Sequence, residues 1–509
     1  MSKWPVIAAL LLLSAACGRK EPAAEPAIPA VRAELVEATA YEASFTVQAV
    51  NAAVLRYGAD ESLPLTQETG TTGPVTCDLT LFGLEPLTDY RLYVQGVGPS
   101  GEEGKVMQVA FSTAKGPDNR YPWEERRSGV PSFADLSLIT LGWHQANPPA
   151  WTEERFASHI SYKDREGVSH WLFDAFLCID GWDPARNLSY SLVNGRNSAV
   201  KESWEDLLEA WLGDDGALKR LDAAVGSAAA VLGNPPAPRY VVMGLPDPVR
   251  YQSFQDKNSP TAYWGKLNGR TLDFADVADQ VAACQWYLDR CRERFQALGL
   301  KHLELAGFYV LSEELPLDPA FYRNAGQAYG SSDTWNWEHK NWEIIVPALA
   351  SYAHSCREGL WWIPYHLAPG YKVWKELRFD AAFMQPNYYW DHDQVSHPLS
   401  ATKNALQKYR MGMELEFEYS LVAAVMADGR SAPDGNGNPT FYAKDVPMLR
   451  ERVRAYMQAY QETGLYGVLP LAVYSGTDAM HELAVSSDPD DRDMYHDLCQ
   501  FIIGSPLKK

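Results

Sequence analysis

Acidic residues gather at two places in the second half of the chain. Glu414, Glu416 and Glu418 alternate with apolar residues, so in an extended strand their carboxyls share one face. A second group, Glu313-Glu314, directly follows another apolar run. Hydrolysis of a glycosidic bond needs one carboxylic acid to protonate the leaving oxygen and a second carboxylate to attack or stabilise the anomeric carbon. Acids from these two places would supply that chemistry if the fold brings them together.

A cluster of carboxylates on one buried face has a physical cost. Like charges repel and lose hydration, so the pKa of at least one member rises, which is what an acid catalyst needs. Two other interpretations stay open from the residues alone. Segment 411–419 fits an amphipathic edge strand with a solvated Glu face, and Glu313-Glu314 fits the first turn of a helix. Pro316 and Pro319 argue against a long helix at that point.

The elements that would position these acids follow a regular order beyond residue 132. Apolar, strand-like runs alternate with helical patterns such as Phe274-Leu298 and Val446-Thr463, which is typical of a parallel sheet built from βαβ units. Eight such repeats predict a (β/α)8 barrel, and no Gly-x-Gly-x-x-Gly or Walker-type loop favours a nucleotide-binding fold instead. The predicted strands are Leu136-Trp143, His170-Ile179, Arg239-Leu245, His302-Val310, Leu360-Tyr365, Ala381-Asn387, Met411-Phe417 and Tyr466-Val473.

Sites of such barrels lie where the strands end and the following loops begin. Aromatic rings at these ends can pack on the apolar face of a pyranose, and Tyr389 and Trp390 are the preferred platforms. The strand-end residues that we predict to bind substrate are Glu414, Glu418, Trp143, His144, Asp180, Trp182, Asp247, Tyr309, Tyr365, His366, Gln385, Asn387, Tyr389 and Trp390.

The placement of the acids resembles a large glycosidase superfamily. Its members keep an acid/base Glu after strand 4 and a nucleophilic Glu on strand 7. The resemblance implies that Glu313 is the acid/base and Glu416 the nucleophile. The chain departs from the superfamily at Ser312, which stands where many members have Asn before the acid, so the contact to the sugar 2-hydroxyl has no assigned residue.

Residues 31–114 have a different pattern, of short alternating runs at close intervals, which predicts a small β-sandwich. The segment from Leu84 to Tyr90 resembles the later-strand signature of fibronectin type III domains, although the usual Trp of an early strand is missing. Such modules are mostly spacers, so we assign no catalysis to it. The predicted strands are Ala43-Val50, Ala53-Tyr57, Pro74-Leu81, Asp89-Val97 and Val106-Ser112.

The N-terminus has the pattern of an export signal. Lys3 precedes an apolar run from Val6 to Leu13 that is too short to span a bilayer. The small residues up to Cys17 resemble a bacterial lipobox, although Ser14 stands where that motif prefers Leu. The resemblance implies residues 1–17 as a lipoprotein signal peptide, lipidation of Cys17, and a cell-envelope protein anchored to the outer membrane; simple cleavage is the alternative. Residues 18–30 are a polar linker.

Composition narrows the partners. A net charge of −20 and a pI near 5.0 leave no basic stripe for phosphates, so nucleic acid is a poor partner and the membrane is reached only through the lipid. The 17 Trp and 27 Tyr suit an oligo- or polysaccharide ligand. The six cysteines besides Cys17 lack a CxxC pattern, and Pro439 interrupts a calcium-loop-like run at Asp434, so we predict no metal and no cofactor.

The stretch from Tyr121 to Ile503 resembles a family of secreted bacterial proteins, common in gut Bacteroidetes and often preceded by a fibronectin-like module, that is known only as a domain of unknown function. The family supplies no reaction. From the number of strands and the positions of the carboxylates, we predict an exported, retaining glycoside hydrolase with a barrel over residues 121–505. Alternatives are a non-catalytic glycan-binding surface lipoprotein with the same cleft, and a barrel hydrolase with another substrate or a degenerate enzyme. The runs that carry the resemblance are Gly307-Phe308-Tyr309, Ser312-Glu313, Trp362-Tyr365, Phe383-Tyr388 and Gly412-Glu416.

Overall fold

The computed structural model describes residues 27–38, 42–63, 65–70, 72–82, 84, 88–114, 119–121, 123–126, 130–143, 150–191, 197–253, 258–330, 333, 341–390, 396–427 and 441–508. The chain divides into two compact units, an N-terminal one that ends at Phe111 and a larger one that contains Ser112–Lys509. In the described part of the chain, no helix has both the length and the apolar character needed to cross a membrane.

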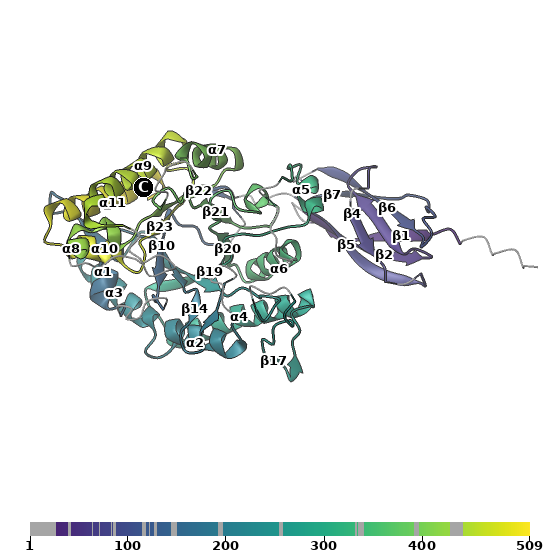
Figure 1. Cartoon of the computed structure of the whole chain (residues 1–509), viewed down its shortest axis with the longest axis horizontal. Coiled ribbons are helices and arrows are strands. Elements are labelled where there is room, and N and C mark those ends of the chain that lie inside the picture. Colours follow the sequence, from purple (N-terminus) through teal and green to yellow (C-terminus); the bar gives the residue numbers. More distant parts are fainter. Residues whose placement is uncertain are drawn as a thin grey trace, which may run out of the picture. The chain divides into compact units, whose positions relative to one another are not determined.

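The N-terminal unit consists of antiparallel sheets, as the alternating pattern predicts (Figure 1). One sheet has the order β1-β2-β5 and the other the order β4-β3-β6-β7. The rings of Phe45 on β2 and Phe111 on β7 lie 5.2 Å apart and join the two sheets, and Tyr90 stacks on Phe111. The strands are β1 Ala30–Ala38, β2 Glu42–Val50, β3 Val54–Gly58, β4 Leu65–Glu68, β5 Val75–Phe82, β6 Asp89–Val97 and β7 Met107–Ser112.

Our sequence pattern located five of these strands and missed β1 and β4. Most residues of β1 are exposed, and β4 is only four residues long, so neither carries a clear alternation of apolar residues. Residues 85–87 of the turn that resembles fibronectin type III lie outside the described residues.

The described residues of the larger unit form a closed parallel barrel with the strand order β10-β13-β16-β19-β20-β21-β22-β23 (Figure 1). This order is the order in the sequence, so each strand pairs with the next and the last closes on the first. The prediction of a (β/α)8 barrel is confirmed. The strands are β10 Asp135–Thr140, β13 Ala175–Ile179, β16 Arg239–Leu245, β19 Leu303–Val310, β20 Gly359–Trp362, β21 Ala381–Met384, β22 Gly412–Glu416 and β23 Leu471–Tyr474.

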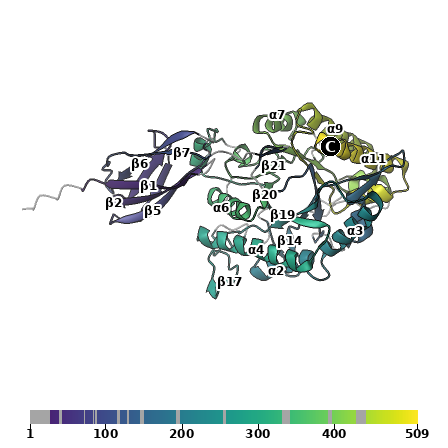
Figure 2. The same ribbon diagram turned by 180° about the vertical axis from the view of Figure 1, so that it is seen from behind.

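Helices surround the barrel strands, as both ribbon views show (Figure 2). The larger ones bury the apolar face that their 3.6-residue period creates; in α9, for example, Leu449, Val453, Tyr456 and Tyr460 all point inward. The α-helices are α1 Glu153–Ile160, α2 Lys201–Leu212, α3 Ala217–Leu232, α4 Val277–Leu298, α5 Pro319–Asn324, α6 Trp342–Ser355, α7 Leu399–Tyr409, α8 Ala423–Ala427, α9 Val446–Glu462, α10 Ala479–Val485 and α11 Pro489–Ile503.

Short strand pairs and 3₁₀ turns also occur in the larger unit. They are the strand pairs β8 Asn119–Tyr121 with β9 Trp123–Arg126, β11 Ser161–Lys163 with β12 Ser169–Trp171, β14 Trp182–Asp183 with β15 Leu188–Ser189, and β17 Lys266–Leu267 with β18 Arg270–Thr271, and the 3₁₀ turns η3 Tyr371–Val373, η4 Tyr419–Leu421, η5 Ala443–Asp445 and η6 Pro506–Lys508.

One glycine of the fourth barrel strand is required by its surroundings. The register between β16 and β19 shifts at Val241/Val242, and Gly307 has a φ of 147° beside this irregularity. A Cβ at this position would collide with the backbone of Gly359 on the next strand. The glycine lets β19 pair closely with β20 just before the chain reaches Glu313.

Charged residues at the beginning of three barrel strands form an ionic cluster at the floor of the barrel. Lys508 Nζ lies 2.7 Å from Asp135 Oδ2 and 3.3 Å from Asp174 Oδ1, and Arg239 donates to Asp174 over 3.1 Å. Burial is the main cause that raises the pKa of Asp135 to about 7, and the charge of Lys508 opposes this rise. Lys508 and Arg239 therefore supply the positive charges of this cluster.

Candidate active site

The strand β22 carries its acids into the barrel. It lies between β21 and β23 in the closed sheet, and all of its residues are buried. Glu416 pairs in register with Tyr474 of β23. Since Glu414 and Glu416 share a face, both reach the same interior, and the exposed edge strand considered from the sequence is wrong.

The carboxylate of Glu416 is held by hydrogen-bond donors from two other elements. Its Oε2 accepts from the backbone N–H of Asn387 at 2.5 Å and from the hydroxyl of Tyr456 at 3.1 Å. The side chain of Trp390 also donates to it. Asn387 has a φ of 52°, an αL conformation that asparagine tolerates well. The loop after β21 and the buried face of α9 together fix this carboxylate.

Glu313 lies in the loop after β19 and not in a helix, because α5 begins only at Pro319. This excludes the first-turn interpretation of the Glu313-Glu314 pair. The Oε1 atom of Glu313 accepts a hydrogen bond from Gln385 Nε2 at 3.1 Å. Gln385 and Asn387 belong to one three-residue segment, so the two carboxyls predicted for catalysis are hydrogen-bonded to the same short piece of chain.

Burial governs the charges of this cluster. Burial raises the pKa of Glu416 to about 8. The hydrogen bonds from Asn387 and Tyr456 lower this pKa, and the charge of the nearby Glu313 raises it further. Burial also raises the pKa of Glu313, which the hydrogen bond from Gln385 opposes. Glu416 accepts more donors than Glu313 does, and donors favour the ionised form. The donors to Glu416 thus favour its ionised form, whereas burial favours its neutral form.

Glu414 lies deeper in the barrel than either of the two. It is 1% exposed, and its Oε1 atom has no hydrogen-bond partner among the described residues. Burial, followed by the charges of Glu416 and Glu313, raises its pKa well above the ordinary value. A neutral Glu414 avoids a third negative charge in the cluster. The expectation that like-charged neighbours raise at least one pKa agrees with this arrangement.

A polar cluster adjoins the two acids at the ends of strands 5 and 6. Asn387 Nδ2 donates to the hydroxyl of Tyr365 at 2.9 Å, and that hydroxyl lies 2.9 Å from His397 Nε2. The rings of His366 and His397 are 5.1 Å apart. All of these residues are partly exposed. They are suited to bind sugar hydroxyls beside Glu416, because imidazole, phenol and amide groups both donate and accept hydrogen bonds.

Two further predicted residues hold the loops of the mouth in place. Asp180 accepts from the backbone N–H groups of Trp143 and Trp182, at 3.3 and 3.2 Å, and from Thr140. Burial raises its pKa to about 6. Asp247 accepts from the backbone N–H of Ser312 at 3.0 Å and so fixes the residue before Glu313. Both carboxylates are buried, and each accepts hydrogen bonds from the protein backbone.

Some of the predicted aromatic contacts belong to the core instead. Tyr389 is 0% exposed, and its hydroxyl lies 2.9 Å from Ser420 Oγ, so the prediction that it is a sugar platform is wrong. Ser420 donates in turn to Glu418, whose pKa burial raises to about 7. Tyr309 is also buried, and burial, followed by the charges of Glu313 and Glu414, raises the pKa of its hydroxyl. Trp390 remains partly exposed and packs on Tyr389 at 4.8 Å.

Predicted residues that lie outside the described residues are Cys17, His144 and the calcium-loop-like run at Asp434. Within the described ranges, no group of three His, Cys, Asp or Glu side chains is arranged to hold a metal ion. The cysteines described are free thiols, and Cys178, Cys284, Cys291 and Cys499 are buried.

Two residues of the site were not predicted. Tyr456 was recognised only as part of the apolar face of its helix, and its hydroxyl at the end of a buried ring was the signal for a polar contact. His397 follows the loop after strand 6, where the strand pattern has already ended. Its sequence position carries no signal for contact with Tyr365.

A comparison with known protein families identifies the family of the barrel. Residues 135–431, more than half of the chain, match the family described as a domain of unknown function, DUF4855. The chain belongs to this family. The match spans β10 to β22 of this DUF4855 protein, and so includes Glu313 and Glu416. None of the curated proteins matches the sequence.

Solved structures show a distant similarity of this DUF4855 protein to glycoside hydrolases. A Bacteroides ovatus GH5 xyloglucanase, in complex with a XXXG heptasaccharide, aligns with 9% identity over 92% of this chain and 99% of its own, with a TM-score of 0.36. A calcium-binding mutant of Bacteroides uniformis β-glucuronidase 2 aligns with 9% identity over 88% of this chain and 45% of its own, with a TM-score of 0.29. This chain thus spans less than half of that enzyme. Similarity at this level carries no conclusion about activity.

Proposed function

We propose that this protein is a retaining glycoside hydrolase in which Glu313 is the acid/base and Glu416 is the nucleophile. The observation that supports the proposal is the shared anchoring of the two carboxyls on Gln385 and Asn387, at the mouth of one barrel. The reaction requires two such carboxyls on either side of a scissile bond, one protonated and one ionised. The donors to Glu416 support its role as the ionised carboxylate, and the raised pKa of Glu313 supports its role as the protonated acid.

The residues divide the steps as follows. Glu313, with its raised pKa, donates its proton to the glycosidic oxygen as the bond to the anomeric carbon breaks. The Glu416 carboxylate, held by Asn387 and Tyr456, forms the bond to that carbon. Glu313 then removes a proton from a water molecule, which hydrolyses the glycosyl ester and restores Glu416. Burial raises the pKa of Glu414, which favours its neutral form and so a lower total charge of the cluster.

The test is a pair of isosteric variants on a panel of glycans and aryl glycosides. Glu416→Gln should lose turnover on every substrate, because no other carboxylate can form the ester. Glu313→Gln should lose turnover on glycans but keep part of it on aryl glycosides whose leaving group needs no proton. Melting curves check that both variants fold. Wild-type rates in both variants would refute the assignment, and binding without new reducing ends would favour a glycan-binding protein.

The stereochemical outcome is an independent test. Proton NMR of the first product shows whether the anomeric configuration is kept. A direct nucleophile predicts retention, whereas inversion would mean that Glu416 activates water as a base.

The N-terminal pattern supports an extracytoplasmic location for this activity. We infer that Cys17 carries a lipid that anchors the protein to the cell envelope. Cys17→Ser should move the protein from the membrane fraction to the soluble fraction without changing the activity of the barrel. A wild-type protein that is itself soluble, with no lipid detected on its N-terminal peptide by mass spectrometry, would overturn the anchor.

A further inference from the structure

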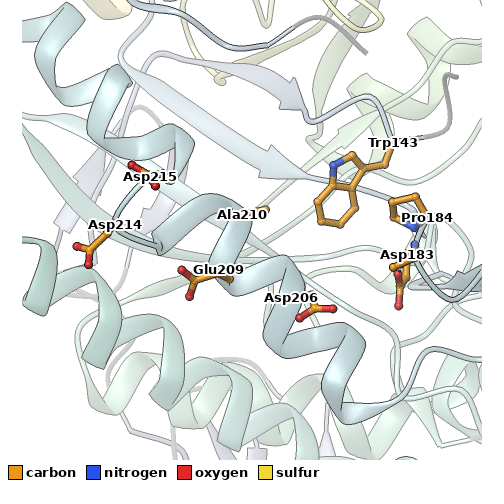
Figure 3. Close-up of a pocket in the computed structure, with 9 residues that line it drawn as sticks. Trp143, Asp183, Pro184, Asp206, Glu209, Ala210, Asp214 and Asp215 are labelled. Atoms are coloured by element: carbon orange, nitrogen blue, oxygen red, sulfur yellow. Dashed lines mark hydrogen bonds between the residues drawn. The ribbon is translucent and has the colours of Figure 1, made fainter. Parts of the chain in front are cut away.

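A groove separate from the cluster of acids runs between the first βα loop and α2. It has a volume of about 510 Å³ and is lined by Trp143, Asp183, Pro184, Ala185, Asp206, Glu209, Ala210, Asp214 and Asp215. Figure 3 shows the indole of Trp143 on one side and α2 with Ala210 on the other. Trp143 lies three residues after the end of strand β10, so this wall of the groove belongs to the rim of the same barrel mouth.

The pattern of α2 explains why its outer face forms a wall. Trp204, Leu207, Leu208 and Trp211 are buried against the barrel. Asp206, Glu209 and Ala210, at spacings of three and four, therefore face outward together. Ala210 has only a methyl group, which leaves the depression opposite the indole ring.

The charges in this groove are largely matched, although five of the lining residues are acids. Arg186 lies 2.9 Å from Asp183 and 2.6 Å from Asp206, Arg294 lies 2.6 Å from Glu209, and Lys219 lies 3.0 Å from Asp214. The lining therefore offers fixed hydrogen-bond acceptors beside their cationic partners, with a small excess of negative charge. Such a lining suits hydroxyl groups and disfavours carboxylated or sulfated chains.

We infer that this groove is a distal subsite that binds a neutral polysaccharide chain, one sugar of which stacks on Trp143. The inference rests on the proposed function, and it adds a substrate class: an extended, uncharged glycan that occupies the mouth from the acids to α2. The partly exposed indole provides the apolar platform, and the paired carboxylates accept hydroxyl hydrogen bonds around it. An oligosaccharide too short to reach the groove loses these contacts.

The test measures binding in the Glu416→Gln background, so that it does not depend on turnover. Isothermal titration uses cello-, xylo- and manno-oligosaccharides of two and six units, with oligogalacturonate as the charged comparator. We expect at least one neutral hexasaccharide to bind more tightly than its disaccharide and than the uronate. Trp143→Ala should lower the affinity for that hexasaccharide roughly ten-fold, which is the loss expected for one aromatic stacking contact.

Ala210→Arg provides a second variant that leaves Trp143 intact. A long side chain at this outward position of α2 fills the groove, so the affinity for the hexasaccharide should fall to a similar degree. Tyr263→Ala removes an exposed aromatic that does not line the groove and is the matched control, with affinity equal to that of the parent.

The outcomes separate the two proposals. Equal affinity of parent, Trp143→Ala and Ala210→Arg for the hexasaccharides, or no binding of any of them, would overturn the groove as a subsite. Tighter binding of the uronate would overturn the neutral substrate class. Loss of hexasaccharide binding in the groove variants together with a wild-type protein that cleaves no glycoside would support the groove and refute the hydrolase.

Discussion

The buried carboxylate of Glu416 should cost the protein stability, and the substitution Glu416→Gln should recover part of it. The side chain is 4% exposed, and its pKa is raised from 4.5 to about 8 in the folded protein. Between these pH values the folded state keeps a proton that the unfolded state releases, so stability falls as pH rises through this window. Each tenfold change in proton affinity is worth about 1.4 kcal/mol, so the cost is at most about 5 kcal/mol above pH 8.

Glutamine removes this titration but does not keep every contact. Its single oxygen can still accept from Asn387 and Tyr456, whereas its NH2 group accepts no hydrogen bond, and a bond lost there costs about 1 kcal/mol. We therefore expect a net gain of roughly 2 to 4 kcal/mol above pH 8, and no gain near pH 4.5. Melting curves of both proteins from pH 5 to pH 9 measure the gain.

The difference in Tm between variant and wild type should grow steadily with pH and reach several degrees. The exposed Glu166→Gln is the control for a change of surface charge. A difference that is the same at pH 5 and pH 9 would show that Glu416 ionises in its ordinary range, and the argument from burial would then fail.

Three further results are expected. Activity should rise towards pH 8 as Glu416 loses its proton, which a profile of kcat/KM against pH measures; an optimum near pH 5 would contradict the raised pKa. Tyr456→Phe removes a hydrogen-bond donor to Glu416, so kcat/KM should fall roughly ten-fold. The acidic limb of the pH profile should also move to higher pH, because the pKa of Glu416 rises. A purely structural role of Tyr456 would leave this limb in place. Lys508→Met leaves Asp135 without its cationic partner at the barrel floor, whereas Asp174 keeps Arg239. The free energy of unfolding should fall by about 3 kcal/mol at neutral pH in denaturant titrations, with a larger loss at higher pH, and an unchanged midpoint would show that Lys508 contributes nothing.

Much of the barrel could be predicted because its signal is local. A buried parallel strand is a short apolar run, and a covering helix repeats its apolar residues every three to four positions. All eight predicted strands correspond to barrel strands, and the helix predicted at Val446-Thr463 is α9. The alternation that placed Glu414 and Glu416 on one face is likewise a property of any extended chain.

Side-chain surroundings could not be predicted in the same way. Tyr389 and Trp390 are adjacent and both aromatic, yet one is fully buried and the other is partly exposed, because the loop after β21 turns between them. Tyr456 and Glu416 are hydrogen-bonded across 40 positions of sequence, and no pattern within either segment records the other.

The sequence by itself determined that this chain forms a parallel barrel whose strands 4 and 7 end in acids, since backbone periodicity and the burial of apolar residues depend only on neighbours along the chain. The tertiary structure decided which acid is held by three donors, which is held by one, and which has a partnerless oxygen. Those differences set the pKa values, and they arise from desolvation and hydrogen bonds between segments that only closure of the barrel brings together.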